Sequence, residues 1–493
     1  MNSVSLAWYL TKARLGFRKG EALLDSFAVI AFAVSSWLTL TTLGGVWMFV
    51  SRLGSIEHTL DRYMSELSGV AIADLRGLND GVAWIYVILA FVALAFLVVP
   101  LVSMGMSAAR LGAQGRSRRL ASLRLVGVTS GQVYVMSVLE TLLQYAIGFV
   151  IGFAVYGASL PAWHQLSFQT QQIAMGEMLL PWWGILAVAA VLGILAAIST
   201  IAGLVRVSIS PLGVARRDSA HSVRVWRVIA LAIVAAGVIA AFQFRLQIEA
   251  FFGIDPSLTA TIVSIAMGMM ILMAFTAVAG PFFVQTTARF GLPSGSASTL
   301  VAARRIVDDP RAAWRNVGSA ALMCFVASAT TTLATTTITI TSVDSTGYSG
   351  KVDPGALSSE IITGDITKGV MIAFAFTIVL AAVGTLIQQA SDVFDRANET
   401  HTLAQIGAPA GTFSRTRFKQ VMYPFVTTLV ACVVVGGLPG VVTAAVQAGG
   451  VIRDNMLLLS AMVGVSVVIM LGSVALTIPI ERGVVTSMQR KND

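Results

Sequence analysis

The chain has 493 residues, of which 56% are hydrophobic and only 12% carry a charge. Soluble globular domains carry charge on about a quarter of their residues, so this composition excludes an ordinary soluble protein. The two cysteines and four histidines show no metal-ligand spacing, and the sequence contains no Walker phosphate-binding motif. We therefore expect no metal site, no disulfide and no ATPase site in this chain.

The segment 1–25 is basic and is expected to form an amphipathic helix on the cytoplasmic surface of the membrane. After it, apolar runs follow one another along the chain. A helix that crosses the apolar core of a bilayer needs about 20 predominantly apolar residues, because its backbone polar groups must be satisfied within the segment. Ten runs meet this requirement, at 26–50, 83–106, 133–157, 180–205, 225–244, 258–283, 317–341, 369–388, 421–446 and 456–480. The sequence predicts an all-α integral membrane protein with about ten transmembrane helices and small extracellular loops.

Basic residues are distributed unequally between the two sides that these ten spans imply. With the N-terminus inside, the inner segments hold 26 of the 33 Lys and Arg residues and 10 of the 24 acidic residues. Cytoplasmic loops carry such an excess of positive charge, so we expect a multi-pass protein of the plasma membrane with both termini in the cytoplasm. Basic loops beside anionic membrane lipid account for the net charge of +9, and no nucleic-acid partner is expected.

A basic amphipathic segment lies between the second and third spans. Its leucines, including Leu123, recur at helical spacing between arginines, and Gly127 permits a turn before the next span. Such a segment suits either docking to a partner protein or binding of its arginines to lipid phosphates. A second copy near residue 400 is much less basic, which favours docking, because a binder of anionic lipid would keep its charge. The residues expected to dock, which the family resemblance described below assigns to coupling with an ATPase, are Arg116, Arg119, Leu123, Arg124 and Gly127 in the first copy and Arg396, Glu399, Leu403 and Gly407 in the second.

Two polar features are expected inside the membrane. Glu140 is the single acidic residue that falls within a predicted span, where it either pairs with a basic residue near the interface or takes part in gating. The hydroxyl-rich run at 328–342 includes Thr332 and Thr336. Its hydroxyls either bond to carbonyls of their own or a neighbouring helix, or line a polar cleft between the two halves of the chain.

An internal repeat at an offset of 280 residues gives the chain its expected organisation. The matched positions are Arg116 and Arg396, Leu123 and Leu403, Gly127 and Gly407, and Gly131 and Gly411. A basic interfacial helix is expected before the first and the seventh spans, at equivalent places in the two copies. The expected domains are the N-terminal helix at 1–25, a four-helix repeat at 26–217, two linking helices at 218–300, a second four-helix repeat at 301–482 and a cytoplasmic tail at 483–493.

The order of the spans, together with two short motifs, resembles the FtsX-like permease domain of ABC transporters, including the MacB, Lol and Bce-type permeases. The motifs are "LRLVGVTSGQV", from Leu123, which is followed by Glu140, and "RVSISPLGVARR", from Arg206. The resemblance implies a non-catalytic membrane subunit that works with a separate cytoplasmic ABC ATPase, with two copies expected. ATP and Mg²⁺ would be bound by that partner, and no cofactor by this chain itself.

The resemblance also implies a function, namely ATP-driven export or outer-leaflet extraction of a hydrophobic or amphipathic substrate such as a peptide antibiotic, a lipid or a lipoprotein. One alternative is a signalling scaffold that transmits ATPase motion to a sensor kinase or a cell-wall hydrolase. A secondary transporter is a third alternative, but it would need ion-coupling charges at the centre of the membrane, and the predicted spans do not offer them.

Overall fold

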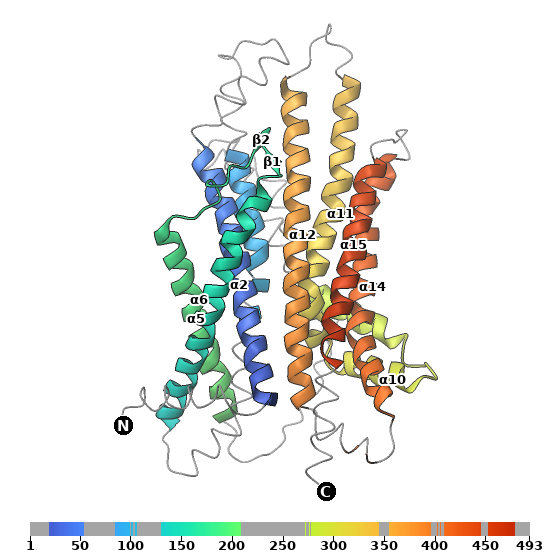
Figure 1. The fold of residues 1–493 in the computed structure, drawn as a ribbon. Helices are drawn as coiled ribbons and strands as arrows, with labels where there is room; N and C mark the ends of the chain where they lie inside the picture. Colours follow the sequence, from blue (N-terminus) through green and yellow to red (C-terminus); the bar gives the residue numbers. More distant parts are fainter. Residues whose placement is uncertain are drawn as a thin grey trace, which may run out of the picture.

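The computed structural model describes residues 19–53, 84–98, 130–208, 278–344, 354–395, 409–444 and 452–478, together with a few single positions between these ranges. Almost all of these residues are helical, and the long helices run side by side in one elongated bundle (Figure 1). The expected all-α class is confirmed for this part of the chain.

The elements of the bundle follow in chain order. They are α2 (Lys19–Arg52), α5 (Ser130–Trp163), β1 (Ser167–Phe168), β2 (Gln171–Gln172), α6 (Trp182–Ser208), α10 (Ala297–Asp308), α11 (Pro310–Asp344), α12 (Pro354–Asp395), α14 (Ala410–Ala444) and α15 (Ile452–Ala475). Two further helical segments lie at Trp84–Val98 and 278–289.

Six helices within the described ranges are long and apolar enough to cross a bilayer, at Asp25–Arg52, Tyr134–Trp163, Trp182–Ala202, Ile361–Val393, Gly411–Gly437 and Leu457–Ala475. Two shorter apolar helices, Trp84–Val98 and Val317–Thr331, fall on two more of the predicted spans. The linking spans expected at 225–244 and 258–283 lie entirely or largely outside the described residues. The chain is a multi-pass membrane protein, and its arrangement as ten helices in two repeats stays a prediction.

Within the first predicted repeat, α2 packs closely against α5 because two glycines face it. A Cβ added to Gly148 would lie 2.6 Å from Cβ of Phe32, and one added to Gly152 would lie 2.9 Å from Cβ of Ser36. The two glycines are four residues apart, the spacing that brings small residues onto one helix face and allows two membrane helices to approach.

Within the second predicted repeat, α11 and α14 pack in a comparable way. A Cβ on Gly436 would lie 2.9 Å from the carbonyl oxygen of Phe325, and the Ser328 hydroxyl donates a hydrogen bond to the Val433 carbonyl at 3.0 Å. The largest apolar core of the bundle surrounds this contact and includes the fully buried Phe374 and Phe425. The hydroxyl of Ser328 therefore bonds across to a neighbouring helix, one of the two expectations for the run at 328–342.

The two predicted repeats meet along α2 and α12, which lie side by side near the middle of the bundle (Figure 1). Apolar residues from both helices share one core cluster, with Phe32 and Leu38 on α2 and Phe376 and Ile387 on α12. Leu97, from the helix Trp84–Val98, completes this cluster. The contact between the two halves of the molecule is thus apolar along most of its length.

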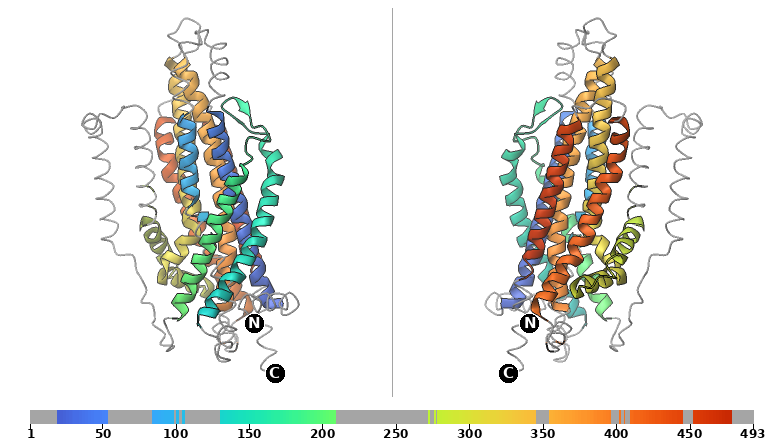
Figure 2. Two further views of the ribbon diagram at one scale, coloured as in Figure 1. Left: turned by 90° about the vertical axis from the view of Figure 1, so that its left-hand side faces the viewer. Right: turned by 90° about the vertical axis from the view of Figure 1, so that its right-hand side faces the viewer.

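The short helix α10 lies at an angle to the bundle and precedes α11 (Figure 2). It buries one face, which includes Ala302 and Ile306, and exposes Arg304 on the other. Lys419 of α14 donates hydrogen bonds to the Ser298 hydroxyl at 3.0 Å and to the Thr299 hydroxyl at 2.6 Å, which ties α10 to the bundle. An amphipathic helix stands where the sequence predicts an interfacial helix before the seventh span.

Exposed tryptophans surround the opposite end of the bundle, which carries β1 and β2 and is called here the hairpin end. Trp84, Trp182 and Trp183 are each more than half exposed, at 51%, 74% and 54%. Tryptophan is enriched where a membrane meets water, because its ring is apolar and its N–H is polar. The hairpin end therefore has the side chains expected at a membrane interface.

Candidate functional site

The residues predicted to couple the chain to an ATPase lie outside the described residues. These are Arg116, Arg119, Leu123, Arg124 and Gly127 in the first copy and Arg396, Glu399, Leu403 and Gly407 in the second. Glu140 is described, and it is buried in α5 as expected for an acidic residue inside a span. Thr332 and Thr336 lie in α11, where their side chains are not described. The functional roles expected for all these residues stay predictions.

The described residues line a partly open cavity of about 340 Å³ between the two predicted repeats. Its walls come from α2, the helix Trp84–Val98, α11 and α12, together with Trp163 at the end of α5 and Phe168 of the hairpin. Other large apolar side chains in the wall include Met48, Phe49, Phe96, Met178, Met323 and Phe376. Ligand cavities in proteins commonly have volumes of about 300–1,000 Å³, so this one is large enough for a small apolar group.

The threonines in the cavity wall do not make it polar. The hydroxyls of Thr41 and Thr42 donate to carbonyls of α2 one turn earlier, at 2.8 and 2.7 Å, and Thr330 does the same within α11 at 2.8 Å. A hydroxyl that bonds to its own helix leaves its methyl group to face outward. The buried indole N–H of Trp163, by contrast, has no hydrogen-bond acceptor among the described residues, and Trp163 lines the cavity.

A small β-hairpin closes one end of this cavity. Strands β1 and β2 pair antiparallel through Ser167 with Gln172 and Phe168 with Gln171. The two turn residues, Gln169 and Thr170, both have positive φ, at 56° and 64°. Two-residue hairpins favour this left-handed turn, which usually contains Asn and Gly. For other residues the left-handed conformation costs about 1–2 kcal/mol each. Contacts outside the hairpin are therefore needed to hold the turn in place.

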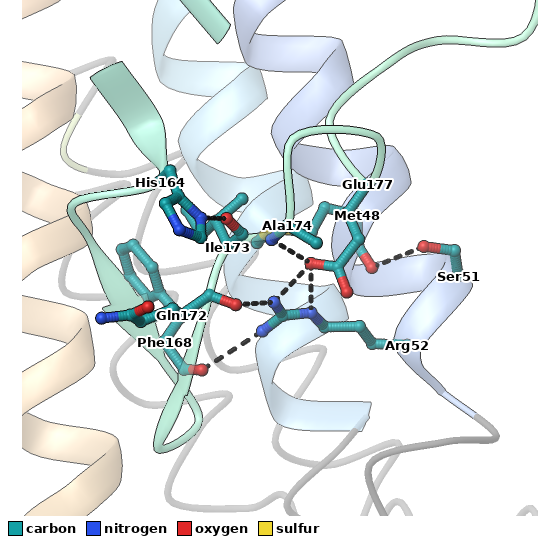
Figure 3. Close-up of polar contacts among 9 residues, drawn as sticks. All are labelled: Met48, Ser51, Arg52, His164, Phe168, Gln172, Ile173, Ala174 and Glu177. Carbon is teal, nitrogen blue, oxygen red and sulfur yellow. Dashed lines mark hydrogen bonds and ion pairs between the residues drawn. The ribbon is translucent and has the colours of Figure 1, made fainter. Parts of the chain in front are cut away.

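Arg52, the last residue of α2, holds the hairpin from one side (Figure 3). Its guanidinium is buried and donates to the carbonyl oxygens of Phe168 and Gln172, both at 3.2 Å. Its Nε donates to the Glu177 carboxylate at 3.1 Å, and that carboxylate also accepts the backbone N–H of Ala174 at 3.2 Å. One arginine thus fixes both strands and the segment that follows them to α2.

Asp365 of α12 holds the hairpin from the other side. Its buried carboxylate accepts the backbone N–H of Gln169 at 2.7 Å and the hydroxyl of Tyr86 at 2.8 Å. Lys368, one turn further along α12, donates to Asp365 at 2.9 Å and to the Ser167 carbonyl at 3.0 Å. These contacts connect α12, in the second predicted repeat, to two elements of the first.

Aromatic rings fill the space below the hairpin. The rings of Phe168 and Phe49 meet edge to face with their centroids 5.7 Å apart, and Phe49 stacks on Tyr86 at the same separation. The ammonium of Lys368 lies 5.8 Å from the centre of the Phe168 ring. Phe168 therefore lines the cavity with its ring while its backbone is held by Arg52.

Arg52, Glu177, Asp365 and Lys368 do not stand out in the sequence, because each lies just outside a predicted span, where charged residues are ordinary. Tyr86 lies inside a predicted span and is one of its several aromatic residues. One signal was available, since Glu177 is the only charged residue between 158 and 180. An isolated acidic residue in an otherwise uncharged loop indicates a specific cationic partner. Its partner, Arg52, is 125 residues away and could not be read from the local pattern.

Comparison with curated proteins and with solved structures gives no match. A family model described as FtsX-like permease C-terminal matches residues 85–211. The matched stretch contains Tyr86, the hairpin and Glu177, whereas Arg52 and Asp365 lie before and after it. Residues 85–211 of the chain are therefore similar to the C-terminal domain of FtsX-like permeases.

Proposed function

We propose that this protein is the transmembrane subunit of an ABC transporter and that a separate cytoplasmic ATPase supplies the energy. The FtsX-like permease match and the bundle of apolar helices support this role. Permeases of this family are typically non-catalytic and generally work with an ABC ATPase. In this proposal, two copies of the ATPase bind ATP and Mg²⁺ and dock on the segments around Arg119 and Leu403.

The hairpin end is proposed to face the outside of the cell. Described basic side chains gather at the α10 end, and they are Arg289, Arg304, Arg305, Arg311, Arg315, Arg415, Arg417 and Lys419. The basic side chains described at the hairpin end are Arg52 and Lys368. Because positive charge is retained on the cytoplasmic side, this distribution supports a cytoplasmic α10 end.

The substrate is proposed to be hydrophobic or amphipathic, and the apolar cavity between the two repeats is the observation that carries this proposal. Each methylene group moved from water into such a cavity gains about 0.8 kcal/mol, so a short alkyl or aromatic group would bind with useful affinity. The indole N–H of Trp163, which bonds to none of the described residues, offers one hydrogen bond to a polar atom of the ligand. This combination suits a molecule that has an apolar part and at least one acceptor.

Charge reversal of the first coupling segment tests the proposed role. The chain would be purified with its ATPase, and ATP hydrolysis would be measured in proteoliposomes for the wild type and for the double variant Arg119→Glu, Arg124→Glu. We expect the variant to insert normally and to lose most of the stimulation of ATP hydrolysis, because the docking contact is electrostatic.

A matched control reverses the same number of positive charges on the same side of the membrane. Arg304→Glu with Arg311→Glu alters two exposed arginines at the α10 end and should leave stimulation close to the wild-type value. Equal activity of the wild type and the Arg119, Arg124 variant would refute the docking segment. Failure to recover any Walker-containing ATPase with the chain would refute the transporter role itself.

A further inference from the structure

The hairpin and its turn, residues 167–172, are called here the lid; they contribute Phe168 to the wall of the apolar cavity and are held by two different parts of the molecule. We propose that the lid is a gate between the cavity and the hairpin end of the membrane, and that Asp365 is the latch that keeps it shut. The proposal rests on the proposed function in taking this side as the outer one and in placing an ATPase at the other end of α12.

The contacts on the two sides of the lid differ in strength and origin. Arg52 belongs to the same predicted repeat as the lid, is buried, and binds two lid carbonyls and Glu177 at once. Across the repeat boundary, Asp365 binds a single lid N–H, and Lys368, whose side chain is 44% exposed, binds a single lid carbonyl. When α12 moves relative to α2, the contacts with α12 are therefore the ones that break, and the lid stays attached to α2.

The turn of the lid favours opening once the latch is released. Gln169 and Thr170 are held in a left-handed conformation that their side chains disfavour, and the Gln169 N–H is the group that Asp365 binds. Loss of this bond frees the turn to relax. Because Phe168 precedes the turn directly, lines the cavity and meets Phe49, relaxation of the turn would move Phe168 and widen the opening of the cavity.

Helix α12 provides a path from the ATPase side to the latch. It is 42 residues long, which corresponds to about 63 Å at 1.5 Å per residue. The latch at Asp365 lies 30 residues, or about 45 Å at 1.5 Å per residue, before Asp395, which ends the helix directly before Arg396 of the second predicted coupling segment. A displacement of that segment would move α12 as a rod, and its effect at the other end would be to separate Asp365 from the lid.

Cysteine accessibility tests the gate on the full-length chain in proteoliposomes without the ATPase. A cysteine is introduced at Val46, a buried residue of the cavity wall, and its modification by a charged, membrane-impermeant thiosulfonate reagent is timed. We expect modification to be at least tenfold faster when Asp365→Ala is also present, and to rise by a smaller factor with Asp365→Asn. The variants that carry only the Asp365 substitution give the background from Cys324 and Cys432.

The matched control is Asp309→Asn, the same chemical change at the α10 end, which should leave the modification rate of the Val46 cysteine unchanged. An equal rate with and without the Asp365 substitutions would overturn the proposal, as would an equal rise with Asp309→Asn. If the Asp365 variants do not fold, Tyr86→Phe removes one contact to the latch and should still raise the rate. Because the ATPase is omitted, this outcome is independent of the test of the transporter role.

Discussion

Arg52 shows how a single side chain can fix an irregular segment at the end of a membrane helix. Its planar guanidinium carries five N–H donors, and the carbonyls of Phe168 and Gln172 together with the Glu177 carboxylate accept from three different nitrogens. A lysine could not reach these acceptors in the same geometry, because its three donors share one nitrogen atom. The fixed shape of the hairpin therefore depends on an arginine at this position.

The pairing of Arg52 with Glu177 can be measured with a double-mutant cycle. We expect Arg52→Met and Glu177→Gln each to lower stability by about 1–3 kcal/mol, because each leaves a polar partner buried with fewer bonds. The double variant should lose less stability than the sum of the losses of the two single variants, because the contact between the two residues can be removed only once. Thermal unfolding in detergent checks this, with the exposed Arg304→Gln as a control. Fully additive losses would mean that the two residues act separately.

At the residue scale, the sequence indicated that Glu140 lies within a span, but it did not indicate the contacts made by the charged residues of the lid. Glu140 stands out because apolar residues surround it on both sides in the chain. Arg52, Glu177 and Asp365 are at the ends of apolar runs, where charged residues are ordinary, and their partners are more than 100 residues away. These residues hold the lid through contacts between segments that are distant in the sequence, and the pattern of neighbouring residues does not reveal such contacts.

Close packing of α2 and α5 is the element-scale feature that most directly depends on particular residues. Gly152 meets α2, whereas Gly157, five residues later on the same helix, has nothing within 4 Å of the position its Cβ would take. We expect Gly152→Val to separate the two helices and to lower stability by about 1–3 kcal/mol, as overpacking typically does. Thermal unfolding and the yield of folded protein would both fall.

Gly157→Val is the matched control, and its stability should remain close to that of the wild type because the added side chain meets open space. Similar losses for the two variants would indicate that helix propensity, rather than the contact with α2, explains the effect. The comparison therefore separates packing between helices from the properties of α5 alone.

At the element scale, hydropathy predicted where the spans lie better than how far the helices extend. The expected span at 369–388 is part of α12, which runs from Pro354 to Asp395. The additional turns of α12 are more polar and include Asp365, a pattern that indicates a loop. Apolar character marks the part of a helix that lipid surrounds, whereas helical structure continues wherever backbone bonds and neighbouring elements support it. The two-residue strands were too short to predict.

At the scale of the whole molecule, the cavity at the contact between the two repeats can be filled by one substitution. Gly369 lines the cavity and has open space where its Cβ would lie. We expect Gly369→Leu to fold normally and to weaken binding of an apolar ligand at least tenfold, because the new side chain occupies the same volume. Binding of a solvatochromic apolar dye to the purified chain, followed by fluorescence, provides the measurement.

Gly384 offers the control for this substitution, since it lies on the same helix, also has open space at its Cβ position, and does not line the cavity. Gly384→Leu should bind the dye as the wild type does. Unchanged binding by Gly369→Leu would exclude the cavity as the dye site. Equal weakening in both variants would point instead to a general effect on α12.

The separation in sequence of the residues that hold the lid has a consequence for biosynthesis. Arg52 is made 125 residues before Glu177, and Gln169 is made 196 residues before Asp365. Since an unpaired buried charge is costly, Arg52 is expected to stay in water until the loop before α6 has been made. The hairpin is then anchored to α2 early but gains its contact with Asp365 only when α12 has been made. Helices α14 and α15 follow α12 in the chain, so the two halves of the molecule become connected at the hairpin before the second half is complete.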